Sequence, residues 1–331
     1  MSEGMIGRRA RLLLRLAVSA ILIAWILRRA PLAEVFAAFR DADLRWIAVS
    51  LLLNPLGYWA SVSRWRLLLR AQGHEVPFGS LVRTFLAGVF FNNFLPSTIG
   101  GDAVRAVDTA RAGVGRGTAV AVVLIDRFLG LLVLLVFAGI GVLAGGPLVE
   151  RAPALYLWVA AGAAAAALAA WLLFVPPGRA AEALDRVGRR LPGRLAGLFA
   201  RASDALFAFR GRGAVQAGAL VWSVFLQGLV VANVYCLARA LHIELPFATF
   251  ILLVPLVLLV SMLPVSINAI GVRENAWAFV LAAYGVASAS AVALAWLDYG
   301  LVLAQALVGG AVYAWGRREA EPAGRASEAL P

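Results

Sequence analysis

Eight long stretches of this chain contain no charged residue, and no other feature limits its fold so strongly. They cover residues 46–63, 84–101, 128–149, 152–178, 213–238, 245–272, 275–297 and 299–316. A helix needs roughly 20 apolar residues to cross the hydrocarbon core of a bilayer, and eight such runs are too many to be buried core helices. Only 15% of the residues are charged, against about 25% in a soluble domain. The sequence therefore predicts an all-α polytopic membrane protein.

The formal net charge is +12, and every basic residue is an arginine. This charge is compatible with binding to nucleic acid or to anionic lipid. Arginine also collects in the cytoplasmic loops of membrane proteins, where it sets their orientation. We favour this last interpretation and expect no nucleic-acid partner.

The two halves of the chain repeat one another. Residues 70–78 and 239–247 share five identical residues at a constant offset of 169. Three further pairs follow in the same order along the chain: Pro96 and Pro264, Arg105 and Arg273, and Asp126 and Asp298. One match could arise by chance, but an ordered series indicates an internal duplication.

The distribution of arginine predicts how the chain threads the membrane. The expected spans lie at about 12–28, 46–63, 118–145, 154–175, 215–238 and 288–315. The first could be a signal peptide, but we expect an uncleaved span because residues 25–29 lack a small-residue cleavage site. The segments 84–112 and 247–286 are broken by Pro and Gly, so we interpret them as re-entrant helical hairpins. Arginines in the loops 64–83 and 176–213 place both loops in the cytoplasm, whereas the four arginines of 28–45 lie on the outer side against this rule.

Each repeat then contains three transmembrane spans and one re-entrant hairpin. Repeat 1 covers about 10–145 and repeat 2 about 154–316, within a single transmembrane domain, 1–316. Because three is odd, the second copy is inverted relative to the first, as in many transporters. We expect a disordered cytoplasmic tail at 317–331, both termini in the cytoplasm, and a location in the bacterial inner membrane.

The hairpin breaks are the first candidate sites. Non-helical backbone cannot face lipid, so the breaks must be buried or line a wet cavity. Free amides at a helix start attract anions, and an Arg fork suits bidentate phosphate recognition. The candidate substrate-binding residues are Asn92, Asn93, Ser97, Gly100, Gly101, Asp102 and Arg105 in the first repeat, and Asn268, Gly271, Arg273 and Glu274 in the second. The alternative is a plain turn followed by a capped helix.

Ionisable residues inside apolar spans form the second candidate set. Asp126, Arg127 and Asp298 are costly in a membrane and are therefore functional candidates by default. Structural ion pairing, for example of Asp126 with a nearby arginine, would also explain their burial. Both interpretations remain open from the sequence.

Enzyme chemistry has no support in the sequence. His74 and His242 are the only histidines, Cys236 is the only cysteine, and no metal-ligand cluster can be built from them. No nucleophile, zinc-protease or phosphate-loop motif occurs. We expect no enzyme activity, cofactor or metal.

Three segments resemble a known family. Residues 92–105 (Asn-Asn-Phe-Leu-Pro-Ser-Thr-Ile-Gly-Gly-Asp-Ala-Val-Arg), the pair Asp126-Arg127 and residues 263–274 are similar to the transmembrane region of lysylphosphatidylglycerol synthases, also called the flippase-like family. The resemblance covers about residues 10–316, and Ala269 stands where the family pattern has Gly. Full-length members join a lipid flippase region to a soluble aminoacyl-transfer domain. The resemblance implies lipid translocation rather than aminoacylation for this chain.

The leading hypothesis is a flippase for an anionic or phosphate-bearing lipid, with a phospholipid or a polyprenyl-phosphate-type lipid as its partner. Pro96 and Pro264 should mark hairpin tips related by a two-fold axis in the membrane plane. A non-transporting subunit that holds a lipid enzyme or a glycosyltransferase is the alternative, and a membrane enzyme is a third. Partners could also include a second copy of the chain.

The topology makes a prediction for cysteine labelling. In a Cys236→Ala background, a single cysteine at position 190 should react only with reagents that reach the cytoplasm, because loop 176–213 carries the largest arginine cluster. Cysteines at Pro147 and Pro246 should react from the outer face. Labelling of position 190 from outside would contradict the predicted orientation.

Overall fold

The computed structural model describes residues 18, 21–26, 28, 32–94, 100–174 and 212–320. Within these residues the chain is helical and contains no strand, which confirms the predicted all-α class. The helices are α2 (Leu32–Arg40), α3 (Leu44–Ala71), α4 (Phe78–Phe94), α5 (Gly100–Arg111), α6 (Arg116–Leu143), α7 (Pro147–Arg151), α8 (Ala154–Phe174), α11 (Gly213–Ala240), α12 (Phe247–Ser261), α13 (Val272–Ala282) and α14 (Ser288–Ala320). Most of the predicted first span and of the loop 176–213 lies outside the described residues.

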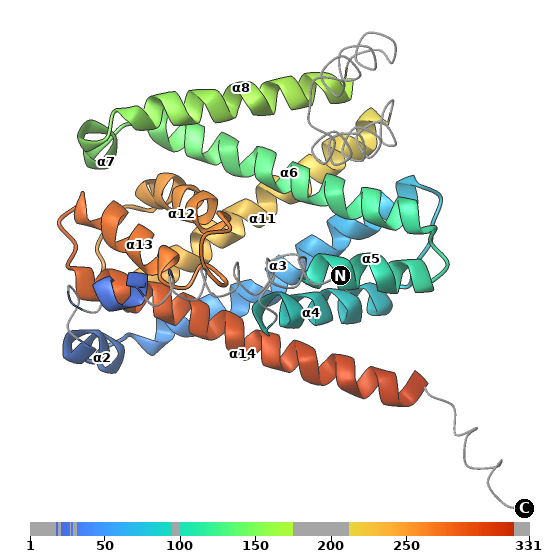
Figure 1. The fold of residues 1–331 in the computed structure, drawn as a ribbon, viewed down its shortest axis with the longest axis horizontal. Helices are drawn as coiled ribbons and strands as arrows, with labels where there is room; N and C mark the ends of the chain where they lie inside the picture. The colour runs from blue at the N-terminus through green and yellow to red at the C-terminus, as the bar shows by residue number, and fades with distance from the viewer. Residues whose placement is uncertain are drawn as a thin grey trace, which may run out of the picture.

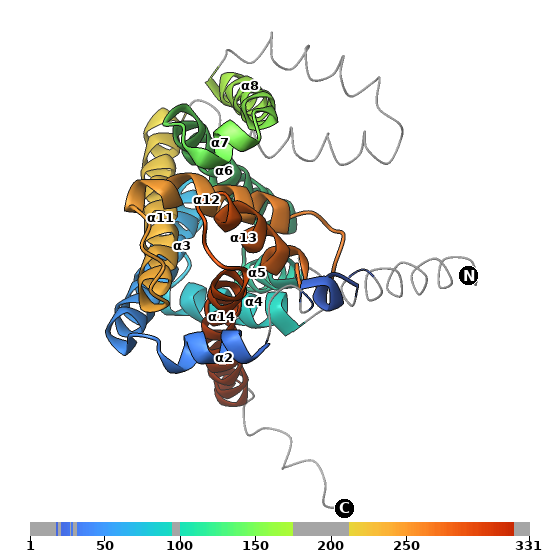
Figure 2. The ribbon, with the colours of Figure 1, turned by 90° about the vertical axis from the view of Figure 1, so that its left-hand side faces the viewer.

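Helices α3 and α11 lie side by side through the middle of the molecule (Figure 1 and Figure 2). Around this pair, α4 packs on α14 and α12 packs on α6. The pairs α4–α5 and α12–α13 each fold back on themselves, and Figure 1 shows them at opposite ends of the molecule. The first arm of each predicted hairpin therefore packs on the last helix of the other half of the chain.

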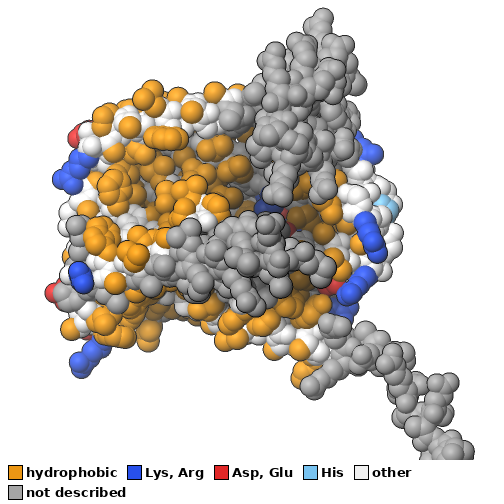
Figure 3. Space-filling model, viewed as in Figure 1, with side chains coloured by type: hydrophobic (Ala, Val, Ile, Leu, Met, Phe, Trp, Pro, Cys, Tyr) orange, Lys and Arg blue, Asp and Glu red, His pale blue; other side chains and the backbone are white. Residues whose placement is uncertain are grey.

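Three helices in the described part of the chain are both long and apolar enough to cross a membrane. They are Arg116–Leu143, Gly213–Ala240 and Ser288–Trp315, which coincide with the predicted third, fifth and sixth spans. In Figure 3, apolar side chains cover the middle of the face in view, and arginines gather toward its two ends. This chain is therefore a helical membrane protein, with an apolar band across the face in view.

The second arms of the two folded-back pairs are short. Helix α5 has 12 residues and α13 has 11, so each is about 18 Å long or less, against a hydrocarbon core of about 30 Å. Residues 262–271, including Pro264, form a non-helical connection between α12 and α13. Helix α4 ends at Phe94 and α5 begins at Gly100; residues 95–99, with Pro96 and Ser97, lie outside the described part.

Helix α3 extends beyond the predicted span 46–63. Its 28 residues make it about 42 Å long. Arg64, expected in a cytoplasmic loop, therefore lies inside this helix and is only 6% exposed. That expectation is wrong because a buried carboxylate on α6 neutralises Arg64, and a count of loop charges cannot detect such a partner. At the other end of the chain, α14 continues to Ala320, so the first residues of the predicted tail are helical.

The apolar core falls into two clusters, one toward each end of the molecule. The larger cluster joins the end of α11 to α12, α13 and the start of α14, and it includes Leu237, Phe250 and Leu281. The smaller cluster joins the end of α3 to the starts of α4 and α6 around Trp65 and Ile125.

Helices α4 and α5 approach each other closely at Gly101. A Cβ atom at this position would lie 2.1 Å from the carbonyl oxygen of Gly88 and 2.6 Å from the side chain of Asn92. The Gly101 N–H donates to Asn92 Oδ1 at 2.7 Å. Only glycine allows the backbone of α5 to come this close to α4.

We predict that Gly101→Ala destabilises the protein by about 1–3 kcal/mol, the usual range for overpacking a closely packed contact. Gly117→Ala is the matched control, because Gly117 lies in α6 and has no neighbour within 4 Å of a new Cβ. The control should be neutral or slightly stabilising. Denaturation of both variants in detergent measures the difference, and equal stability would contradict the close contact.

Candidate functional site

Three buried charged side chains meet where α3, α5 and α6 come together. Asp126 on α6 accepts from Arg64 Nε on α3 at 2.7 Å and from Arg105 Nη1 on α5 at 3.1 Å. All three side chains are at most 7% exposed. Arg64 also donates from Nη1 to Ser223 Oγ on α11 at 2.7 Å. The Asp126 carboxylate thus joins α3, α5 and α6, and the Ser223 hydroxyl connects α11 to Arg64.

A second ion pair extends this cluster. Arg127 donates to both carboxylate oxygens of Asp102, at 2.8 and 2.9 Å. Arg105 Nη1 lies 3.8 Å from the same carboxylate. Three guanidinium groups and two carboxylates leave one net positive charge. We call Arg64, Asp102, Arg105, Asp126 and Arg127 the arginine cluster.

Arg105 has unused hydrogen-bonding capacity. Its Cζ atom lies 4.4 Å from the centre of the Trp65 ring and 5.7 Å from that of Phe85. Its Nε and Nη2 atoms are buried and have no hydrogen-bond partner. Aromatic faces hold a guanidinium by cation–π attraction but do not satisfy its N–H groups. An acceptor in the neighbouring cavity would remove this cost.

The arginine cluster lines a cavity of about 410 Å³. Its walls come from α3, α4, α5, α6, α11 and α12, and all five members of the cluster contribute. Asn92 and Gln227 add polar groups, while Leu131, Leu134 and Met262 add apolar surface. The cavity can hold a charged group together with an apolar one.

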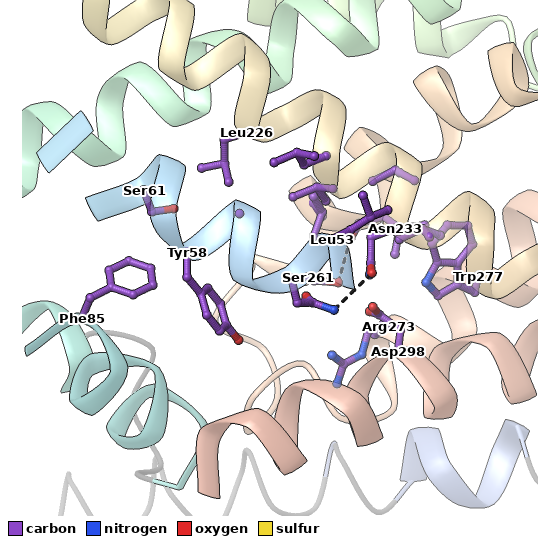
Figure 4. Close-up of a pocket in the computed structure, with 18 residues that line it drawn as sticks. Leu53, Tyr58, Ser61, Phe85, Leu226, Asn233, Ser261, Arg273, Trp277 and Asp298 are labelled. Carbon is purple, nitrogen blue, oxygen red and sulfur yellow. Dashed lines mark hydrogen bonds between the residues drawn. The ribbon is translucent and has the colours of Figure 1, made fainter. Parts of the chain in front are cut away.

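A smaller cavity of about 240 Å³ contains the second charged pair (Figure 4). Arg273 on α13 and Asp298 on α14 both line it, and Figure 4 shows their side chains close together. Arg273 Cζ lies 4.0 Å from the centre of the Tyr299 ring. Its Nε and Nη2 atoms, like those of Arg105, are buried without a hydrogen-bond partner.

Polar side chains from α3 and α11 complete this smaller cavity. Asn233 Oδ1 accepts from Ser50 Oγ at 2.6 Å and from Asn54 Nδ2 at 3.2 Å. Tyr58 donates to the side chain of Gln305. The hydrogen bond between Asn54 and Asn233 thus joins α3 to α11.

The two cavities adjoin each other. Five residues line both of them: Ser61, Phe85, Leu226, Leu258 and Ser261. The arginine cluster therefore lies on one side of this shared wall and the Arg273–Asp298 pair on the other. Two charged centres therefore line two adjoining cavities in an otherwise apolar bundle.

The second break is held by its own side chains. Asn268 and Ala269 have φ angles of 49° and 57°, and Gly271 has φ 81°. Left-handed backbone at Ala269 costs about 1–2 kcal/mol, at the position where the family pattern has Gly. Glu274 Oε2 accepts from the Gly271 N–H at 2.7 Å, so this acid caps α13.

The two breaks also contact each other. Asn268 Nδ2 donates to the carbonyl oxygen of Asn93 at 2.7 Å, across 175 residues of sequence. The amides of Gly101 and Gly271 are occupied by Asn92 and Glu274, so these two amides are not free for an anion. Among the residues that line the cavities, Arg105, Arg273 and Gln227 have buried donor atoms without a hydrogen-bond partner.

The structure divides the predicted site residues into three groups. Asn92, Asp102, Arg105, Asp126 and Arg127 line the larger cavity, and Arg273 and Asp298 line the smaller one. Asn93, Gly101, Asn268, Gly271 and Glu274 shape the breaks, and Gly100 is the first residue of α5. Ser97 lies outside the described residues.

The sequence analysis missed Arg64 and Ser223. The repeat contained a signal for both, because the offset of 169 residues aligns Arg64 with Asn233 and Asn54 with Ser223. The aligned positions form equivalent contacts between α3 and α11, Arg64 with Ser223 and Asn54 with Asn233.

The described residues contain no group of three His, Cys, Asp or Glu side chains that could hold a metal ion.

These features define a helical membrane protein with two charged centres on adjoining cavities. The chain belongs to the family of the lysylphosphatidylglycerol synthase TM region, whose model matches residues 12–309. This finding confirms the resemblance seen in the sequence. No curated protein matches the chain.

We predict that Asp126→Asn is strongly destabilising. The substitution preserves shape but leaves Arg64 and Arg105 buried without their shared counter-charge, which should cost about 3–5 kcal/mol. Adding Arg64→Gln should recover part of this loss, since one unpaired cation is removed. Asp108→Asn is the control: its partner Arg111 is 70% exposed, and the loss should stay below about 1 kcal/mol. Equal losses in denaturation of the two Asp→Asn variants would contradict the role given to Asp126.

Proposed function

We propose that this protein is a lipid flippase or transporter that moves an anionic or phosphate-bearing lipid between the leaflets. The observation that carries the proposal is that Arg105 and Arg273, which line adjoining cavities, each have two buried guanidinium nitrogens without a hydrogen-bond partner. A phosphate has the charge and the acceptor oxygens to satisfy such groups, often in bidentate geometry. Membership of the lysylphosphatidylglycerol synthase TM region family also favours lipid as the substrate.

An inverted repeat would give a transport route through these cavities two gates. Its support comes from the reciprocal packing of α4 on α14 and α12 on α6, and from folded-back helix pairs at opposite ends of the molecule. The equivalent contacts of Arg64 with Ser223 and Asn54 with Asn233 fit the same symmetry. Two copies of opposite orientation provide gates of similar energy on opposite sides, which alternating access requires.

The headgroup would pass from one charged centre to the other. In the proposed cycle the arginine cluster holds the phosphate on one side of the shared wall, and Arg273 holds it on the other. The acyl or polyprenyl chains stay in the apolar band outside the route. We further propose that the protein acts in the bacterial inner membrane with both termini in the cytoplasm.

We predict that Arg105→Lys and Arg273→Lys each slow headgroup-dependent exchange by about tenfold. A lysine retains the charge but lacks the planar fork, so about one charge-assisted hydrogen bond is lost. Arg111→Lys is the matched control, because Arg111 lies on the same helix as Arg105 and is exposed. Leaflet exchange of labelled lipids in proteoliposomes, at equal protein incorporation, measures the effect.

Two outcomes would contradict the proposal. Exchange at the wild-type rate in both variants would assign these arginines a structural role. Absence of exchange by the wild-type protein across a panel of phospholipids and polyprenyl phosphates would favour the alternative, a non-transporting subunit of a lipid- or glycan-modifying complex.

A further inference from the structure

A third cavity lies on the outer surface of the bundle, separate from the two that carry the proposed transport route. It measures about 430 Å³ and is lined by Trp59, Ser63, Arg66, Leu67, Arg70, Phe78 and Trp222. Five of these residues come from α3, and the others come from the starts of α4 and α11. None of them lines either inner cavity. We call this cavity the outer groove.

The outer groove changes from apolar to basic along α3. Positions 59, 63, 66, 67 and 70 fall on one face of a helix, because neighbours on a face recur every three or four residues. The two arginines lie at the end of the helix, near its last residue Ala71. Trp59 lies about three turns before Arg70 on α3. Its ring centre is 5.0 Å from that of Trp222. From Trp59 to Arg70 the helix rises about 16 Å.

An exposed apolar track continues from the groove toward the middle of α3. Leu52 and Leu56 lie on the same helical face and are 71% and 46% exposed. Val221 and Phe225 on α11 are exposed beside Trp222. Along α3, Trp59 lies between this track and the two arginines, and tryptophan is enriched where headgroups meet acyl chains. The groove and track together match the length and polarity of a phospholipid, with its headgroup at the arginines.

Arg66 gives the groove its charge preference. Its Cζ atom lies 5.8 Å from the centre of the Phe78 ring. Its Nε atom is buried and has no hydrogen-bond partner. Arg70 has one acidic partner, the exposed Glu75 at 3.4 Å, and no acid lines the groove itself. An isolated, partly desolvated guanidinium favours an anion over a zwitterion, whose own cation would be repelled.

We propose that the outer groove binds one anionic phospholipid, whose phosphodiester accepts from Arg66 and whose acyl chain follows the track past Trp59 and Leu56. Basic pockets between transmembrane helices are known to hold anionic headgroups in this way. The bound lipid would fix the ends of α3 and α11, the central helix pair of the bundle. This inference does not depend on the proposed transport function, because the two inner cavities have no lining residue in common with the groove.

Native mass spectrometry of the detergent-purified protein tests the proposal, with phosphatidylglycerol and phosphatidylcholine of equal acyl chains as probes. The wild-type protein should retain one phosphatidylglycerol at least about tenfold more tightly than phosphatidylcholine. Arg66→Gln should remove about this tenfold preference, the effect of one charge-assisted hydrogen bond. Arg111→Gln removes a charge from an exposed arginine on α5, outside the groove, and should retain the preference.

A pair of variants at Ser63 tests the site without touching either arginine. Ser63→Glu places a carboxylate three residues before Arg66, where it can pair with the guanidinium, and it should abolish the preference for phosphatidylglycerol. Ser63→Gln has nearly the same size without the charge and should retain it. Equal retention of the two lipids by the wild-type protein, or equal behaviour of the two Ser63 variants, would overturn the proposal.

Discussion

The salt bridges of Asp126 are the interaction on which the rest of the bundle depends. A single carboxylate on α6 neutralises Arg64 from α3 and Arg105 from α5 in a region with little access to water. Burying charges in such a medium is costly unless each is paired and hydrogen-bonded. The pairing therefore fixes α3, α5 and α6 relative to one another, and it holds Arg105 at the wall of the larger cavity.

The helix breaks impose the second constraint. A chain that interrupts its helices inside a membrane protein must provide partners for the exposed backbone groups. Asn92 caps the start of α5 from the neighbouring helix, whereas Glu274 caps the start of α13 from within it. The two halves thus solve the same problem with different residues. Since these side chains occupy two of the amides that could hold an anion, the guanidinium groups provide the free donors of the site.

The two charged centres resemble each other in position but differ in charge. At the position aligned with Arg64, the second half has Asn233, so the Arg273–Asp298 pair lacks a second cation, while the arginine cluster has one net positive charge. In the proposed transport cycle, this difference would make one end of the route hold an anionic headgroup more tightly than the other. An exact repeat would give two equal ends, and the difference between Arg64 and Asn233 removes that equality.

The sequence by itself determined the helical membrane class, the repeated elements and most members of the two charged centres. Charge-free runs of this length are stable only in the interior of a membrane. Charges are rare among such runs, so the sequence makes four of them recognisable: Arg105, Asp126, Arg273 and Asp298. Only the tertiary structure decided which charges meet. The sequence places Arg64 in a loop, but the packing of α3 on α6 brings it to Asp126. Asp298 has no evident partner in the sequence, but the packing of α13 on α14 brings it into one cavity with Arg273. The pattern along a chain records the polarity of each residue, but the free energy of a buried charge depends on partners that lie far away in sequence.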